Sequence, residues 1–243
     1  MFPSRRITLG GGDVFRDEYS LEFDNTNDYV NLGNVVNLGS TTDFTITCWA
    51  KSSDWTNEYI IAKWEDANNR WGMGTDAFDR LAFNSMGSSS AGIEYTGGTL
   101  TSYENKWVHL TIVADRSTDT RGYINGVLDD TDTGTDPDLD LDNTGNLSIG
   151  FNDQGDRYFG GKISEVAIWN TALSAGSVSN IYNNGVPTDL LADSNSANLQ
   201  GWWRMGDGTE GASGTTIYDM SANTNNGTMT NMDAGTDYVT DVP

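Results

Sequence analysis

Short runs in which apolar and polar residues alternate recur along this chain of 243 residues, and residues typical of turns separate them. A period of two places successive side chains on opposite faces of an extended strand, so each run predicts a strand of an antiparallel sheet. Such runs occupy residues 19–23, 44–51, 107–115, 121–128, 146–151 and 162–169. Both faces of the 107–115 run are bulky, which favours a central strand that is covered on each side.

Turn and helix signals complete the prediction of the fold. Asn125-Gly126 predicts a two-residue hairpin, because both turn positions of such a hairpin require a positive φ. One short helix is expected at 174–182, with Ser174 as its N-cap. So many strands need two packed layers, and the fold class we expect is all-β: a two-sheet antiparallel jelly-roll sandwich with one short helix.

The chain is expected to form a single domain over residues 19–243. It has only 4 prolines and no Ser/Gly tract between two apolar halves, while 8 Trp, 10 Tyr and 8 Phe supply bulk to fill the space between two sheets. Residues 1–18 differ, because Arg5 and Arg6 precede three consecutive glycines, and they are interpreted as a flexible N-terminal arm. The alternative is an arm that docks on an acidic neighbouring subunit.

Five segments of the chain carry a resemblance to a known family. They are YSLEFDNTNDYVNLG (19–33), DFTITCWAKS (43–52), IIAKW (60–64), NKWVHLTIVADRSTDTRGYINGVL (105–128) and FGGKISEVAIWNTALSAGSVSNIYNNG (159–185). In order and spacing they resemble the strands and the helix of laminin-G-like modules, which belong to the concanavalin A-like lectin/glucanase superfamily. The resemblance implies the jelly-roll fold of that superfamily.

The C-terminal part adds a second likeness. Residues 201–231 resemble a strand and turn that usually stand at the start of such modules, which implies that this strand pairs near the first one. This order, on an acidic body, is similar to the laminin-G-like modules of marine bacteriophage structural proteins. The resemblance implies a virion component.

The charge of the chain limits its partners. It carries 35 acidic and 13 basic residues, a formal net charge of −22, which repels phosphate backbones and anionic lipid heads. Neither nucleic acid nor membrane insertion is therefore expected. Since the N-terminus lacks the apolar stretch of a signal peptide and no stretch approaches a transmembrane span, the location expected is the virion or the extracellular space.

The sequence offers no arrangement that predicts catalysis. A glycoside hydrolase needs two carboxyl groups roughly 5 to 9 Å apart across a cleft. Glu165 stands alone on its predicted strand, and His109, the only histidine, has no recognisable triad partner. We predict that the protein is not an enzyme, and an unusual glycoside hydrolase is the catalytic alternative.

Two predicted turns collect oxygen-bearing side chains of the kind that calcium prefers. The resemblance implies calcium at a rim of the sandwich, so these side chains are the expected metal ligands: Asp24, Asn25, Asp28, Asp153 and Asp156. The alternative is that they bond to their own backbone as turn residues, as we also expect of the 218–228 segment.

Three tryptophans are candidate ligand-binding rings. Trp55, Trp64 and Trp71 lie in or beside predicted loops, where their faces would serve as platforms for a sugar; the alternative is that they pack in the core. The function expected from all of these features is a non-enzymatic binding or structural module on a virion surface, in capsid decoration or tail association, whose partners are its own copies or other virion proteins. The alternative is a calcium-dependent lectin for cell-surface glycans.

Overall fold

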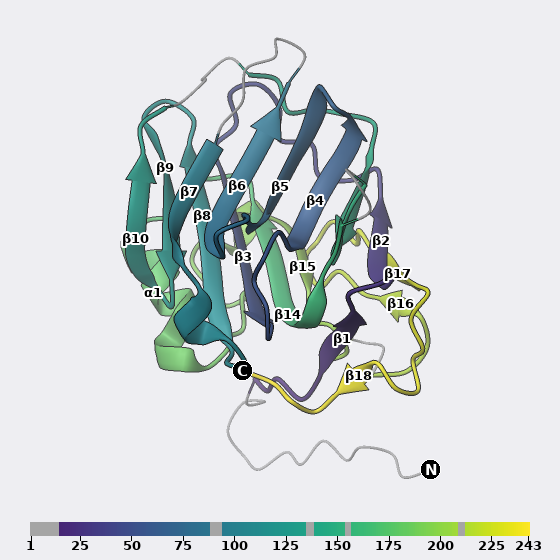
Figure 1. Cartoon of the computed structure of the whole chain (residues 1–243). Coiled ribbons are helices and arrows are strands. Elements are labelled where there is room, and N and C mark those ends of the chain that lie inside the picture. Colours follow the sequence, from purple (N-terminus) through teal and green to yellow (C-terminus); the bar gives the residue numbers. More distant parts are fainter. Residues whose placement is uncertain (1–14, 88–93, 135–138, 154–156, 209–211) are drawn as a thin grey trace.

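The computed structural model describes residues 15–87, 94–134, 139–153, 157–208 and 212–243. Two large antiparallel sheets pack face to face, and one short α-helix lies beside them (Figure 1). The prediction of an all-β, two-sheet sandwich with one short helix is therefore confirmed for the described residues. Within them, no helix is long and apolar enough to cross a membrane.

The first sheet contains both ends of the described chain. Its strands, in spatial order, are β10 (Val127–Asp132), β9 (Asp119–Ile124), β8 (Val108–Asp115), β3 (Phe44–Lys51), β14 (Gly160–Trp169), β1 (Ser20–Asp24) and β18 (Tyr238–Val239). A further strand, β15 (Leu199–Trp203), pairs with β14 beyond the end of β1. The strand expected in residues 201–231 to pair near the first strand corresponds to β15, which pairs with β14, the same strand that β1 pairs with.

The second sheet covers one face of the first. Its strands, in spatial order, are β16 (Thr216–Ile217), β17 (Gly227–Thr230), β2 (Tyr29–Gly33), β11 (Asn146–Ile149), β4 (Tyr59–Asp66), β5 (Asn69–Thr75), β6 (Arg80–Met86) and β7 (Glu94–Thr99). A short hairpin of β12 (Phe151–Asn152) and β13 (Arg157–Tyr158) follows β11. Single 3-10 turns lie at η1 (Thr101–Tyr103), η2 (Asn183–Gly185) and η3 (Ser196–Asn198).

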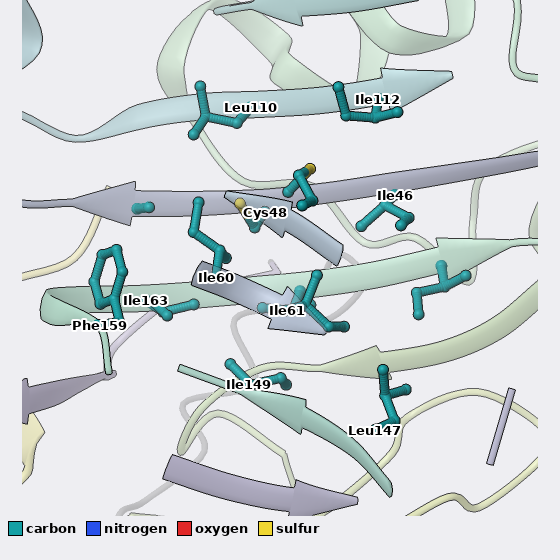
Figure 2. Close-up of a cluster of buried hydrophobic side chains, with 14 of the residues drawn as sticks. Ile46, Cys48, Ile60, Ile61, Leu110, Ile112, Leu147, Ile149, Phe159 and Ile163 are labelled. Atoms are coloured by element: carbon teal, nitrogen blue, oxygen red, sulfur yellow. The ribbon is translucent and has the colours of Figure 1, made fainter. Parts of the chain in front are cut away.

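The core lies between the two sheets. Cross-strand pairs such as Ile46 with Ile112 and Cys48 with Leu110 place four buried side chains of β3 and β8 on the inner face. Full burial of one such aliphatic side chain contributes about 1.5–3 kcal/mol. Figure 2 shows this layer with residues from both sheets: Ile46, Cys48, Ile60, Ile61, Leu110, Ile112, Leu147, Ile149, Phe159 and Ile163.

The outer face of the first sheet is covered by the helix α1 (Ala175–Tyr182). Val178 and Ile181 of α1 pack in a second apolar cluster with Val113 of β8 and Trp169 of β14. The side-chain oxygen of Ser174 accepts a hydrogen bond from the Ser177 N–H, as expected of an N-cap. This cover explains why both faces of β8 are buried, as its sequence predicts.

The N-terminal segment begins its contacts before the boundary expected from the sequence. Phe15 stacks on Trp202 with ring centroids 6.0 Å apart, and Asp207 accepts hydrogen bonds from the backbone of Glu18 and Tyr19. Residues 15–18 are therefore packed on the sandwich, and the flexible arm predicted for 1–18 does not include them. Residues 1–14 lie outside the described part of the chain.

Candidate ligand-binding site

The loop between β1 and β2 holds three of the predicted calcium ligands. Asp24 Oδ1 accepts hydrogen bonds from the backbone N–H of Thr26 at 2.8 Å and of Asn27 at 3.1 Å, while Asp28 Oδ2 accepts one from the Asp24 N–H at 3.1 Å. Asn25 has a φ of 58°, in the left-handed region that asparagine tolerates. These bonds form a closed Asx-type turn, which was the alternative reading of this segment.

The two carboxylates of this turn have different electrostatic surroundings. Burial would raise the pKa of Asp24, but three backbone N–H donors outweigh it and lower the pKa. Burial and the neighbouring carboxylates of Asp24 and Asp237 raise the pKa of Asp28 to about 6. In the described residues, no group of three or more His, Cys, Asp or Glu side chains converges to hold a metal ion. Calcium binding in this loop stays a prediction.

The second predicted calcium segment lies close to the first. Asp153 is exposed in the turn after β12, and Asp156 falls outside the described residues. The ring of Tyr29, which opens β2, lies 5.0 Å from the ring of Phe151 in β12, measured between centroids. This contact brings together the strands that adjoin the two acidic segments.

Four half-buried aromatic rings gather at this place, and we call them the aromatic patch: Tyr29, Tyr59, Phe151 and Tyr158. Phe151 stacks on Tyr158 with centroids 4.7 Å apart and an interplanar angle of 22°. The exposed Arg157 places its guanidinium carbon 6.0 Å from the centroid of the Tyr59 ring. Ring faces, phenol hydroxyls and a cation are therefore presented together.

The strand period explains why these rings point outward. Val30 and Ile60 are fully buried in the core, so Tyr29 and Tyr59, which directly precede them, lie at positions of the opposite face. Ile61 also points inward because the pairing of β4 with β5 shifts register between Tyr59 and Ile61. Tyr59 extends over the backbone of Gly72 in β5, where an added Cβ would lie 3.1 Å from its ring. A glycine at this position lets the ring lie flat on the sheet.

The three tryptophans predicted to bind a ligand have different positions. Trp55 and Trp71 are 0% and 1% exposed and belong to the core between the sheets, so neither ring presents a face to solvent. Trp71 pairs with the buried Lys63 of β4, which places both side chains on the inner face. Trp64 is half-buried on the outer face, with the guanidinium carbon of Arg70 4.8 Å from its ring centroid. Only Trp64 of the three keeps a position suited to a ligand.

The rings of the aromatic patch were not among the residues predicted from the sequence to bind a ligand. Tyr29 stands at an outward position of the alternating strand β2, which was a signal in the sequence. Tyr59 had no such signal, because the four residues after it in β4 are all buried. Phe151 and Tyr158 carried none, because their hairpin is only two residues long on each side. Their proximity to Tyr29 follows from the pairing of β2 with β11, which residue types do not specify.

The candidate catalytic side chains are enclosed. Complete burial lowers the pKa of His109 to about 3, so its ring is neutral, and it packs against Trp49 at 5.1 Å between centroids. Glu165 is 5% exposed; its Oε1 accepts a hydrogen bond from Arg204 Nε at 2.8 Å and its Oε2 accepts one from Trp202 Nε1 at 2.5 Å. The side chains of His109 and Glu165 line one cavity of about 10 Å³, which has room for about one water molecule.

Comparisons with known proteins place this fold in a family. A family model described as the concanavalin A-like lectin/glucanases superfamily matches residues 24–179, more than half of the chain. No curated protein matches the sequence.

Several solved structures share the fold. A protein from Bacteroides ovatus, provisionally named a carbohydrate-binding protein, is 20% identical with a TM-score of 0.68; the match covers 97% of this chain and 66% of that one. The heptameric SAP-like pentraxin of Limulus polyphemus is 16% identical with a TM-score of 0.53, over 70% of this chain and 83% of that one. At these identities the likeness is one of fold alone. With this architecture and the match to the family model, the chain belongs to the concanavalin A-like lectin/glucanase superfamily.

Proposed function

We propose that this protein is a non-catalytic carbohydrate-binding module that recognises its ligand through the aromatic patch. The observation that carries the proposal is the set of four half-buried rings beside Arg157 on the outer face of the second sheet. The apolar face of a pyranose ring stacks on aromatic side chains, while its hydroxyls bond to nearby phenols and guanidinium groups. Trp64 and Arg70 extend the same face toward the far end of β4.

A glycoside hydrolase is the alternative function. The superfamily's description names both lectins and glucanases, so membership alone does not separate binding from hydrolysis. His109 and Glu165 are buried, so neither supplies a general base to the patch. Asp28, whose carboxyl pKa is raised to about 6, directly precedes Tyr29, and loss of polysaccharide turnover in Asp28→Asn would favour the hydrolase.

Binding to a glycan array tests this proposal, followed by calorimetric titration of the best ligand. Tyr158→Ala should weaken binding at least tenfold, which corresponds to about 1.4 kcal/mol, because it removes one of the two stacked rings of the patch. Phe78→Ala is the matched control, since Phe78 is an aromatic residue that is 71% exposed in the turn between β5 and β6.

Two results would contradict the proposal: no binding to any glycan, or equal losses for Tyr158→Ala and Phe78→Ala. Repeating the titration in EDTA separates a calcium-dependent lectin from a calcium-independent one. Loss of binding in EDTA would support the predicted ligands Asp24, Asp28 and Asp153.

Assembly on a virion surface is a second candidate function. Val127 and Leu128, on the outermost strand β10 of the first sheet, are 69% and 50% exposed. Adjacent exposed apolar side chains on an edge strand suit a protein partner. Co-purification with capsid or tail proteins that is lost in Leu128→Asp, with glycan binding unchanged, would favour this role.

A further inference from the structure

The carboxylate of Asp241, near the C-terminus, is held by three donors: Lys51 of β3, Lys162 of β14 and Trp107, which directly precedes β8. Lys51 Nζ and Lys162 Nζ each lie 2.8 Å from Asp241 Oδ2, and Trp107 Nε1 donates to Oδ1 at 3.0 Å. Partial burial would raise the pKa of Asp241, but the hydrogen bonds from Lys162, Lys51 and Trp107 hold it well below its usual range. We call these three donors the carboxylate clamp.

The clamp is an unusual arrangement for this chain. Lys51 and Lys162 are direct cross-strand partners on β3 and β14, and like charges in that position repel each other. The chain has only 13 basic residues against 35 acidic ones, so two opposed lysines are a costly placement unless an anion lies between them. The clamp is therefore built to bind a carboxylate.

The backbone just before Asp241 pairs with β1 as an additional strand at the edge of the first sheet. Val239 pairs with Ser20 and Tyr238 with Leu21, so β18 forms the edge of the first sheet beside β1 (Figure 1). In addition, Ser20 Oγ donates to the Asp241 carbonyl oxygen at 2.8 Å. Main-chain pairing combined with a side-chain anchor is how β-strand addition recognises a peptide.

This strand is accessible from solvent. The side chains of Asp241, Lys51 and Lys162 are 37%, 25% and 20% exposed, so their ion pairs can open to solvent. Tyr238 of the same segment is half-buried against the core, and it is the main apolar contact that opening breaks. A strand of only two residues at the edge of a sheet has few main-chain bonds to break, so it belongs to the parts of a protein that open readily. Opening leaves the edge of β1 unpaired, Lys51 without its carboxylate, and Lys162 with only the longer contact to Glu22 at 3.9 Å. Any segment of the same sequence restores these contacts.

We propose that the C-terminal segment Tyr238–Pro243 is an exchangeable strand, and that the edge of β1 with the carboxylate clamp binds the same segment of a second copy of this chain. The partner is defined by its chemistry: an extended peptide with a carboxylate two residues after the paired position. Exchange of an identical element needs no new interface, because each contact made within one chain is made again between two.

Disulfide trapping on the full chain tests the exchange. One copy carries Ser20→Cys and a second, tagged copy carries Val239→Cys, so the disulfide between them forms only when the segment pairs in trans. Cys48, the only native cysteine, is buried, and burial raises the pKa of its thiol, so it does not compete. The expected product is a mixed disulfide dimer whose yield rises with protein concentration. Adding Asp241→Asn to the tagged copy should lower that yield severalfold.

Two controls make the result decisive. A chain with both cysteines should close its own disulfide, which verifies the pairing. Ser20→Cys mixed with Leu191→Cys measures random collision, because Leu191 is 49% exposed and lies outside every proposed binding surface. Exchange is overturned if the double variant closes while the mixture gives no more dimer than the random control. If the double variant does not close its disulfide, peptide binding decides the question. A chain ending at residue 237 should then bind a labelled peptide of residues 236–243, and bind it more tightly than the same peptide with Asp241→Asn. Absence of binding, or equal binding of the two peptides, also overturns exchange.

Discussion

Glu165 is a buried carboxylate in an unusual backbone conformation. It lies in the left-handed region with a φ of 51°, at a bulge of β14 where the pairing with β3 shifts register. A bulge re-aims a side chain, and here the carboxylate meets Arg204 and Trp202. Burial raises the pKa of Glu165, whereas Arg204 acts against it. The sequence showed Glu165 as an isolated carboxylate, because nothing local indicates a bulge or a partner so far along the chain.

Loss of Arg204 should therefore be strongly destabilising. Arg204→Met leaves Glu165 buried without its cation, and we expect the free energy of unfolding to fall by about 3 kcal/mol in urea titrations. Arg80→Met is the matched control, since Arg80 forms a more exposed pair with Asp76 and should lose under about 1 kcal/mol. Equal losses in the free energy of unfolding for the two variants would show that the buried ion pair stabilises the protein no more than the exposed one.

At the scale of elements, the alternation of residues predicted most of the strands and their positions. The strand β3 matches the predicted 44–51, and Asn125-Gly126 forms the predicted hairpin with φ values of 51° and 73°. The turn at 218–228 is also as expected: Asp219 accepts hydrogen bonds from the backbone N–H of Trp202, Ser221 and Asn225. These elements were predictable because local periodicity or turn chemistry specifies them.

The predictions that were wrong concern side chains whose positions depend on tertiary packing. Trp55 and Trp71 were expected in or beside loops, but β5 extends through Trp71 and directs its indole inward, and Trp55 is fully buried. Phe15 belongs to a segment that looks featureless in sequence, yet it stacks on Trp202, which is remote in the chain. No local pattern contains either contact.

The helix α1 gives a test at this scale. Ser174→Ala removes the hydrogen bond that caps the first turn, and we expect a loss of about 1 kcal/mol in the free energy of unfolding. Ser179→Ala is the control, because Ser179 is exposed within the same helix and alanine is the better helix former. Denaturant titration of both variants should show the loss for Ser174→Ala alone.

At the scale of the whole molecule, the net charge of −22 acts on every part of the surface. Such a charge destabilises a compact state by self-repulsion, and salt screens it over a Debye length of about 8–10 Å at physiological ionic strength. The composition alone therefore predicts that added salt stabilises the folded protein.

We expect the melting temperature to rise by a few degrees between about 0.05 M and about 0.5 M NaCl, measured by calorimetry. Calcium chloride at matched ionic strength separates screening from binding: an extra rise that disappears in Asp28→Asn would support the predicted calcium site. An equal rise in both salts would argue against calcium in this loop, and a fall with added salt would contradict the charge argument.

Both sheets join strands from opposite ends of the chain. β1 lies between β14 and β18, and β2 lies between β11 and β17, so each sheet receives its neighbours from sequence made much later. During synthesis, β1 and β2 have no partner until β14 and β11 have been translated, and each then keeps one open edge until β18 and β17 follow. Pairing between such distant segments forms slowly, so the open edges of β1 and β2 expose the nascent chain to pairing with other chains.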